Sequence, residues 1–202
     1  MMEIILPEQA IPHRVPLLRP TRRRRPRRRL RRRNSAPPRR DALPRQQAYT
    51  QGNLATTYAR LGRYERALQI EGDVYQGYLR HLGEEHGDTL ITVNNYVNSL
   101  IINNRSEEAQ VLMRKMIPVA RRTLGEGHET TLQMRWNYAL ALYRDAGATV
   151  DNLREAVTTL EDTEQIARRV LGGAHPLTGR IEFRLREARE ELAARETPSP
   201  SA

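Results

Sequence analysis

Apolar residues recur along residues 46–196 with the spacing of amphipathic helices. The first segment has apolar side chains at i, i+4 and i+7, which is one helical face: Leu54, Tyr58 and Leu61. A second segment follows Gly62 and carries a stripe of the same kind: Ala67, Val74, Tyr78 and Leu82. No segment shows the strict alternation of a half-buried strand. The pattern predicts two antiparallel helices joined by a short turn.

This pair of segments is repeated. Asn53 recurs after 42 residues as Asn95 and after another 42 as Asn137. The alanine of the second helix recurs after 42 and then 47 residues: Ala67, Ala109 and Ala156. A fixed period in this range is typical of a solenoid of stacked helix pairs. The five extra residues of the third copy are expected in Ala146–Asn152, between the two helices of that unit.

A motif of the form L-G-x-x-H-x-x-T separates the units. It begins at Leu82, Leu124 and Leu171. The glycine is expected to end a helix in the left-handed conformation, and the following residues to open the next helix. A zinc site would require the three histidines to converge: His86, His128 and His175. Because they lie in successive turns and the chain has no cysteine, we interpret them as turn residues and expect no metal and no cofactor.

The net charge of +10 is concentrated at one end of the chain. Residues 1–45 hold 15 arginines and three acidic residues, a formal charge of +12, which leaves −2 for residues 46–202. Arg22–Arg33 contains ten arginines in twelve residues, and such like-charged runs favour disorder. The run is a candidate nucleic-acid contact or nuclear import signal: Arg22, Arg23, Arg24, Arg25, Arg27, Arg28, Arg29, Arg31, Arg32 and Arg33. Attraction to an anionic membrane surface is a further interpretation. Coding bias is the competing explanation, since the chain has 33 arginines and a single lysine.

The sequence lacks the usual signs of an enzyme or of a membrane-spanning protein. It has no P-loop, no G-x-S-x-G, no H-E-x-x-H and no cysteine nucleophile. It also has no run of 18 apolar residues. We therefore expect a non-catalytic protein with no membrane span. A cytoplasmic location is expected, with the nucleus as the alternative if the arginine run acts as an import signal.

Together these patterns predict an all-α fold, a right-handed superhelical array of three antiparallel helix pairs and a C-terminal capping helix. The expected boundaries are a disordered tail over 1–45, repeats over about 46–87, 88–129 and 130–175, a cap over 176–196, and a disordered end over 197–202. The cap is expected because its segment keeps a helical period while its outer face is heavily charged.

Three motifs resemble those of tetratricopeptide repeats of the kinesin light chain type, over roughly residues 46–185. They are N-L-A at Asn53–Ala55, G-R-Y-E-R-A at Gly62–Ala67, and the L-G-x-x-H-P-x-T form at residues 171–178. The second unit departs from the pattern, with Asn104 and Ser106 in place of glycine and tyrosine. No coiled-coil heptad run precedes the repeats. Kinesin light chains use such a run to join the heavy chain, so association with a motor is not expected here.

The resemblance implies an adaptor that binds peptide segments in a concave groove. The asparagines that would hold a peptide backbone are Asn53, Asn95 and Asn137, whose amides offer both a donor and an acceptor. Further candidates on the same face are Tyr49, Asn94, Asn98, Trp136 and Tyr143. In the alternative interpretation each asparagine pairs with the backbone of the neighbouring unit as a structural spine, and Trp136 is inter-helix core. The alternative function is a nucleic-acid-associated protein bound through the arginine-rich tail.

Overall fold

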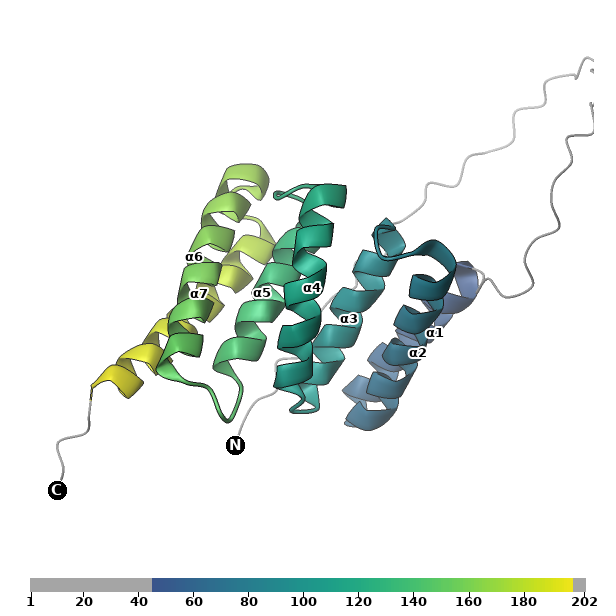
Figure 1. The fold of residues 1–202 in the computed structure, drawn as a ribbon, viewed down its shortest axis with the longest axis horizontal. Coiled ribbons are helices and arrows are strands. Elements are labelled where there is room, and N and C mark those ends of the chain that lie inside the picture. Colours follow the sequence, from purple (N-terminus) through teal and green to yellow (C-terminus); the bar gives the residue numbers. More distant parts are fainter. Residues whose placement is uncertain (1–44, 198–202) are drawn as a thin grey trace, which may run out of the picture. The chain divides into compact units, whose positions relative to one another are not determined.

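The computed structural model describes residues 45–197, and these are all-helical (Figure 1). Their seven helices, in chain order, are α1 (Arg45–Arg60), α2 (Tyr64–Leu82), α3 (Gly87–Ile102), α4 (Ser106–Leu124), α5 (Glu129–Tyr143), α6 (Val150–Leu171) and α7 (Pro176–Glu196). The prediction of three helix pairs followed by one capping helix is confirmed.

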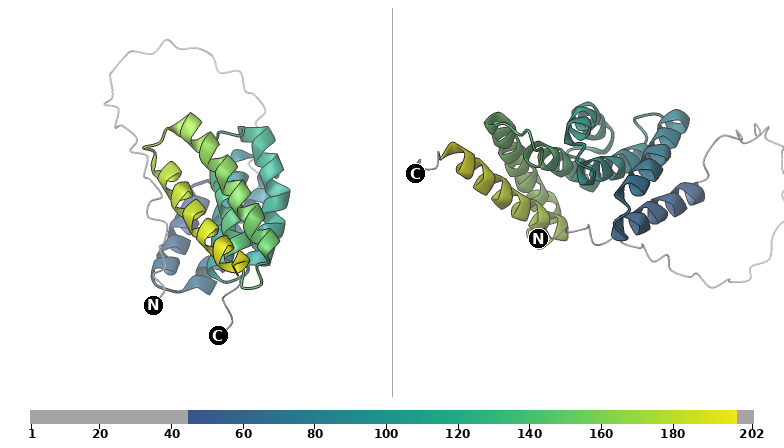
Figure 2. Two further views of the ribbon diagram at one scale, coloured as in Figure 1. Left: turned by 90° about the vertical axis from the view of Figure 1, so that its left-hand side faces the viewer. Right: turned by 90° about the horizontal axis from the view of Figure 1, so that it is seen from below.

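The helices lie in two layers. In Figure 1 the even-numbered helices are in front and the odd-numbered helices behind them. Seen from below, α1 and α7 lie at the two ends of an arc, on the side away from α4 (Figure 2). The inner side of this arc is therefore lined by the odd-numbered helices. We call their surface on that side the odd-helix face.

The core lies between the two layers and includes Ala67 and Val74 of the predicted second stripe. The expected burial of Leu54, Leu61 and Leu82 is wrong, because these side chains are 45%, 65% and 44% exposed. The largest fully buried side chains of the core are Leu90, Leu100, Met113, Met116, Leu132, Met134, Leu142, Leu153, Leu160, Leu177 and Ile181.

We call two residues register equivalents when they hold the same place in the repeat. They are 42 positions apart between α1, α3 and α5 or between α2 and α4, and 47 apart between α4 and α6 or between α5 and α7. Alanine recurs at one register position of the core, where Ala67, Ala109 and Ala156 are all buried.

The repeated motif forms the junction between units. Gly83, Gly125 and Gly172 end the even-numbered helices with φ of +83°, +95° and +89°, a backbone that favours glycine. At each junction the following histidine accepts a hydrogen bond at Nδ1 from a backbone N–H of the next helix, at 3.1–3.2 Å. The histidines are thus N-caps, which satisfy donors that a helix start leaves open. Among residues 45–197 no group of histidine, aspartate and glutamate is arranged to hold a metal ion.

The turn inside each unit explains one departure from the repeat pattern. Gly62 has φ +72°, and its register equivalent Asn104 has φ +57°. Asparagine tolerates this left-handed conformation better than most residues, so it replaces glycine with the turn geometry kept.

The third unit accommodates its extra residues differently from the prediction. Residues 144–149 form the turn, but α6 already begins at Val150, so Val150–Asn152 belong to its first turn. The expectation that Ala146–Asn152 lie between the helices is therefore wrong for the last three residues. The reason is a capping box, in which Thr149 and Asn152 each accept a hydrogen bond from the other's backbone N–H.

Helix α7 has charged side chains on the face where α3 has buried apolar ones. In α3, the side chains of Val97, Leu100 and Ile101 are buried. Their register equivalents in α7 are exposed and charged: Arg186, Arg189 and Glu190. A further helix would have no apolar surface to cover at these positions, so α7 ends the stack.

The first unit contains an acidic residue in its core. Glu71 of α2 is 6% exposed and is the register equivalent of Met113 and Leu160. Burial raises its pKa to about 7 from an ordinary 4.5, because ionisation in an apolar surrounding is unfavourable.

None of the described helices combines the length and the apolar character that crossing a lipid bilayer requires.

Candidate functional site

The predicted asparagine row lies on three successive odd-numbered helices, but its members differ in exposure. Asn53 of α1 and Asn95 of α3 are exposed, whereas Asn137 of α5 is buried. The register equivalent in α7 is Arg184, which is 7% exposed. The surroundings of each step from one odd-numbered helix to the next account for this difference.

We call a step closed when side chains of the two odd-numbered helices contact each other across it. The step from α3 to α5 is closed by amide side chains. Asn137 Nδ2 donates to Asn94 Oδ1 at 2.9 Å, and Asn94 Nδ2 lies 3.5 Å from Gln133 Oε1. Gln133 in turn donates to Glu129 at 3.2 Å. Asn137 thus makes a contact between units, as the spine interpretation expects, but its partner is a side chain and not the backbone of the neighbouring unit. Its amide is committed to the stack, as is the buried amide of Asn94.

The step from α5 to α7 is closed by an aromatic–cation contact and an ionic network. The Arg180 guanidinium lies 5.2 Å from the centre of the Trp136 ring, and Trp136 packs half-buried against the core. Trp136 is the register equivalent of Asn94, and Arg180 that of Gln133. The same two positions therefore meet at both steps, with different chemistry.

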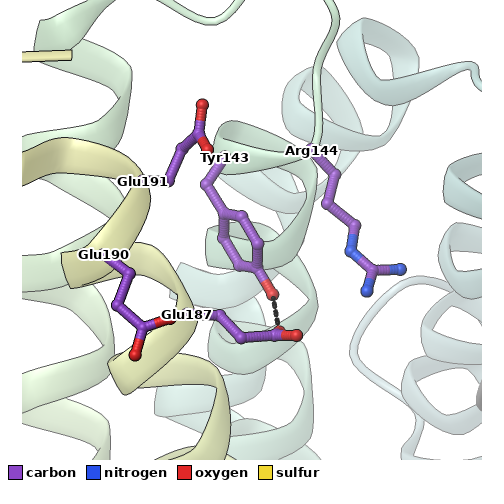
Figure 3. A pocket seen from close by; sticks show the side chains of 5 residues that line it. All are labelled: Tyr143, Arg144, Glu187, Glu190 and Glu191. Atoms are coloured by element: carbon purple, nitrogen blue, oxygen red, sulfur yellow. Dashed lines mark hydrogen bonds between the residues drawn. The ribbon is translucent and has the colours of Figure 1, made fainter. Parts of the chain in front are cut away.

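Tyr143 and Glu187 make the second contact at this step, in a hollow between the end of α5 and α7 (Figure 3). Tyr143 Oη donates to Glu187 Oε2 at 2.9 Å, and Arg184 donates to the same oxygen at 2.6 Å. Burial raises the pKa of Tyr143 to about 12, so its hydroxyl remains a donor. Burial acts to raise the pKa of Glu187, but the hydrogen bonds from Arg184 and Tyr143 outweigh it and the pKa is lowered. The side chains that line the hollow are Tyr143, Arg144, Glu187, Glu190 and Glu191.

The step from α1 to α3 has no comparable closure. No Cα atom of α1 lies within 8 Å of one of α3, whereas α3 and α5, and α5 and α7, do approach this closely. The register equivalent of Asn94 and Trp136 is Gly52, and a Cβ atom built there would meet nothing within 4 Å. Across the step Ile91 is 49% exposed, and Asn95 is exposed beside it. We call Gly52, Asn53, Ile91 and Asn95 the open step.

The other predicted site residues have varied surroundings. Asn98 is half-buried on α3. Tyr49 lies in α1, but its side chain is outside the described residues. All ten arginines of Arg22–Arg33 also lie outside the described residues.

Sequence reasoning missed several residues of the odd-helix face. Ile91 stands where the next two units have Gln133 and Arg180, and an apolar residue in a polar register position was a usable signal. Arg184 and Glu187 were overlooked because α7 lacks the asparagine and glycine marks and was interpreted only as a cap. Continuing the 47-residue offset from Asn137 would have placed Arg184 in the asparagine row.

Comparison with known proteins agrees with this architecture. The family model described as tetratricopeptide repeat matches residues 47–88, which is the first unit and the start of the second. Residues 47–88 are therefore a tetratricopeptide repeat. The two further copies of the unit follow from the register and from the helix pairs described above.

Two solved structures show a similar fold. Both come from Podosopora anserina and contain the nearly identical TPR-like repeats of a candidate kinesin light chain. One, a point variant, has a TM-score of 0.62 at 21% identity, over 79% of this chain and 72% of that one. The other has a TM-score of 0.56 at 19% identity, over 81% of each chain. The chain has no significant match among curated proteins.

Proposed function

We propose that this tetratricopeptide array is a non-catalytic adaptor that binds an extended peptide along the odd-helix face. The observation that carries the proposal is the pair of exposed amides, Asn53 and Asn95, one repeat apart on successive odd-numbered helices. An extended peptide presents a donor and an acceptor in each peptide group, and an amide side chain complements both. Asn137 supports the same surface from within, because its buried contact with Asn94 holds α3 against α5.

The exposed pair and the buried residue have different expected roles. Replacing Asn53 and Asn95 removes groups that face solvent, so the fold should be kept. Each amide hydrogen bond contributes about 0.5–1.5 kcal/mol net, and the loss of two corresponds to roughly ten- to a hundred-fold in affinity. Replacing Asn137 removes a contact within the stack and should act first on stability.

The test begins with peptides selected on the immobilised full-length chain from a random dodecamer library. The tightest synthetic peptide is then titrated by calorimetry into the wild type, the Asn53→Ala/Asn95→Ala double variant and Asn137→Ala. The proposal predicts the affinity loss in the double variant with an unchanged urea midpoint. Unchanged affinity in a folded double variant would exclude the odd-helix face as the binding surface.

The arginine run favours a second candidate function. Ten arginines in twelve residues are suited to neutralising nucleic-acid phosphates, and such binding weakens steeply with salt. Deletion of residues 1–45 distinguishes the two functions. It should abolish salt-sensitive binding to a 20-nucleotide RNA while leaving the affinity for the selected peptide within about twofold, the RNA binding being measured by fluorescence anisotropy.

A further inference from the structure

The two closed steps of the array show what occupies the corresponding place in each. At the first closed step the side chain of Asn94 from the earlier helix reaches Gln133 and Asn137 of the next. At the second, Trp136 lies against Arg180. In both, one side chain from the earlier helix fills the space between successive odd-numbered helices.

At the open step this side chain is missing. Gly52 holds the position, the space beyond its Cα is open, and α1 and α3 stay more than 8 Å apart at every pair of Cα atoms. The residue that a side chain at position 52 would reach by register is Ile91, which is 49% exposed. A single exposed aliphatic side chain is common on a protein surface, and Ile91 is distinguished by its register position. Gln133 and Arg180 hold that position in the later units, and each contacts a side chain of the preceding odd-numbered helix.

The chemistry around Ile91 defines what fits. The register positions facing the open step are all uncharged: Gly52, Asn53, Thr56, Ile91, Asn95 and Asn98. The α5–α7 step, in contrast, carries Arg180, Arg184 and Glu187. A charged ligand side chain would lose hydration at the open step without gaining an opposite charge, whereas an apolar one would bury its surface and that of Ile91.

We propose that the open step is the specificity-determining subsite of the peptide surface and takes one apolar side chain of the ligand, aromatic or large aliphatic. The ligand side chain takes the place that Trp136 takes in the α5–α7 step, and the exposed amides of Asn53 and Asn95 hold the peptide backbone on either side of it. This inference rests on the proposed function, because the ligand is the same peptide.

The decisive variant is Gly52→Trp, which supplies the missing side chain from the protein itself. It is expected to fold, because a Cβ at position 52 meets no neighbouring atom and replacing glycine within a helix is favourable. Gly52→Ala is the size control, since it adds one methyl group and leaves most of the space. Gly179→Trp is the matched control elsewhere, because Gly179 is an exposed helical glycine with equally open surroundings.

The probe is the tightest dodecamer selected on the full-length wild type. The peptides selected should share one apolar residue, and its replacement by alanine should weaken binding to the wild type at least tenfold. Gly52→Trp should weaken the parent peptide to a similar degree, with Gly52→Ala changing the affinity less than threefold and Gly179→Trp leaving it unchanged. In the Gly52→Trp background the alanine peptide should bind within twofold of the parent, because the subsite is already filled.

Three results would overturn the inference. The apolar residue binds elsewhere if Gly52→Trp and wild type bind the parent peptide equally. The same follows if the affinity loss from Gly52→Trp and the loss from the alanine peptide simply multiply when combined. In both cases the effect of Asn53→Ala/Asn95→Ala still supports the proposed function. If the selected peptides share a charged residue in place of an apolar one, the chemistry assigned to the subsite is wrong. If no dodecamer is selected, or binding ignores the asparagines, the proposed function fails and this inference with it.

Discussion

The first helix pair, α1 and α2, and the third, α5 and α6, follow one sequence pattern but meet their neighbours differently. α5 contacts odd-numbered helices on both sides, through the Asn137–Asn94 hydrogen bond and the Trp136–Arg180 contact. Among the described helices, α1 has Cα atoms within 8 Å only of those of α2. The third unit has Leu160 in the core position where the first has Glu71. The comparison shows that units with one sequence pattern and one helix-pair fold can differ in how closely they approach the next odd-numbered helix.

The largest change in stability is expected when the acidic residue of the first unit is introduced at the equivalent position of the second unit. Met113→Glu places a carboxyl group at the register position of Glu71, but between units that pack on both sides. The variant should lose at least about 3 kcal/mol of stability at pH 8, because burying an unpaired polar group adds to the loss of apolar packing. Urea unfolding followed by circular dichroism measures this. A loss no larger than the gain in the reciprocal variant below would mean that the two units are packed alike.

The reciprocal change, Glu71→Met, should stabilise the first unit in a pH-dependent way. Since the folded-state pKa is raised from 4.5 to about 7, the wild type has no ionisation penalty below pH 4.5. The penalty grows as the pH rises to 7 and is complete above it, at about 3 kcal/mol. Glu71→Met should remove this fall in stability. The gain should be seen at pH 8 as slower hydrogen exchange in α1 and α2, and near pH 4 it should fall to the part that apolar packing contributes. An equal gain at both pH values would place the effect in packing alone.

An intermediate loss of stability is expected in the asparagine row, where a buried and an exposed asparagine can be compared. Asn137→Ala leaves the Asn94 Oδ1 acceptor buried without its donor and should cost about 1–3 kcal/mol. Asn95→Ala, at the exposed register equivalent, should change stability by less than about 0.5 kcal/mol. Thermal and urea midpoints of the two single variants measure the contrast. Equal costs would show that the open step is closed in solution.

A smaller loss than that of Asn137→Ala is expected at the helix starts. His128→Ala removes the acceptor for the Thr130 N–H and should cost about 1 kcal/mol, while His128→Asp should retain most of the stability because aspartate is also an N-cap acceptor. The first unit has Pro44 at this register position, so capping by histidine belongs to the later units. Urea unfolding of both variants checks this, and equal losses would assign the histidine a role in packing instead.

Much of the fold could be predicted because it depends on local patterns. The 42-residue register, the apolar stripes and the glycines at the even-helix ends each report on a neighbouring turn or on the helix's own face. The register also marks two exceptions in the sequence itself. Ile91 is apolar where its equivalents are polar, and Glu71 is acidic where its equivalents are apolar. The start of α6 was misplaced because Thr149 and Asn152 form their capping box through side-chain geometry that spacing alone does not reveal.

The sequence by itself determined the number and order of the helices, the repeat unit, the residues at the junctions and the charged outer face that ends the stack. It did so because these depend on contacts between residues close in the chain or one register unit apart. Only the tertiary structure decided which asparagines remain available. Asn53, Asn95 and Asn137 are the same residue at equivalent sequence positions. Their exposure to solvent depends on the distance between the odd-numbered helices and on one side chain across each step. Where Asn94 or Trp136 fills that space the array closes, and where Gly52 leaves it unfilled Ile91 and Asn95 face the solvent.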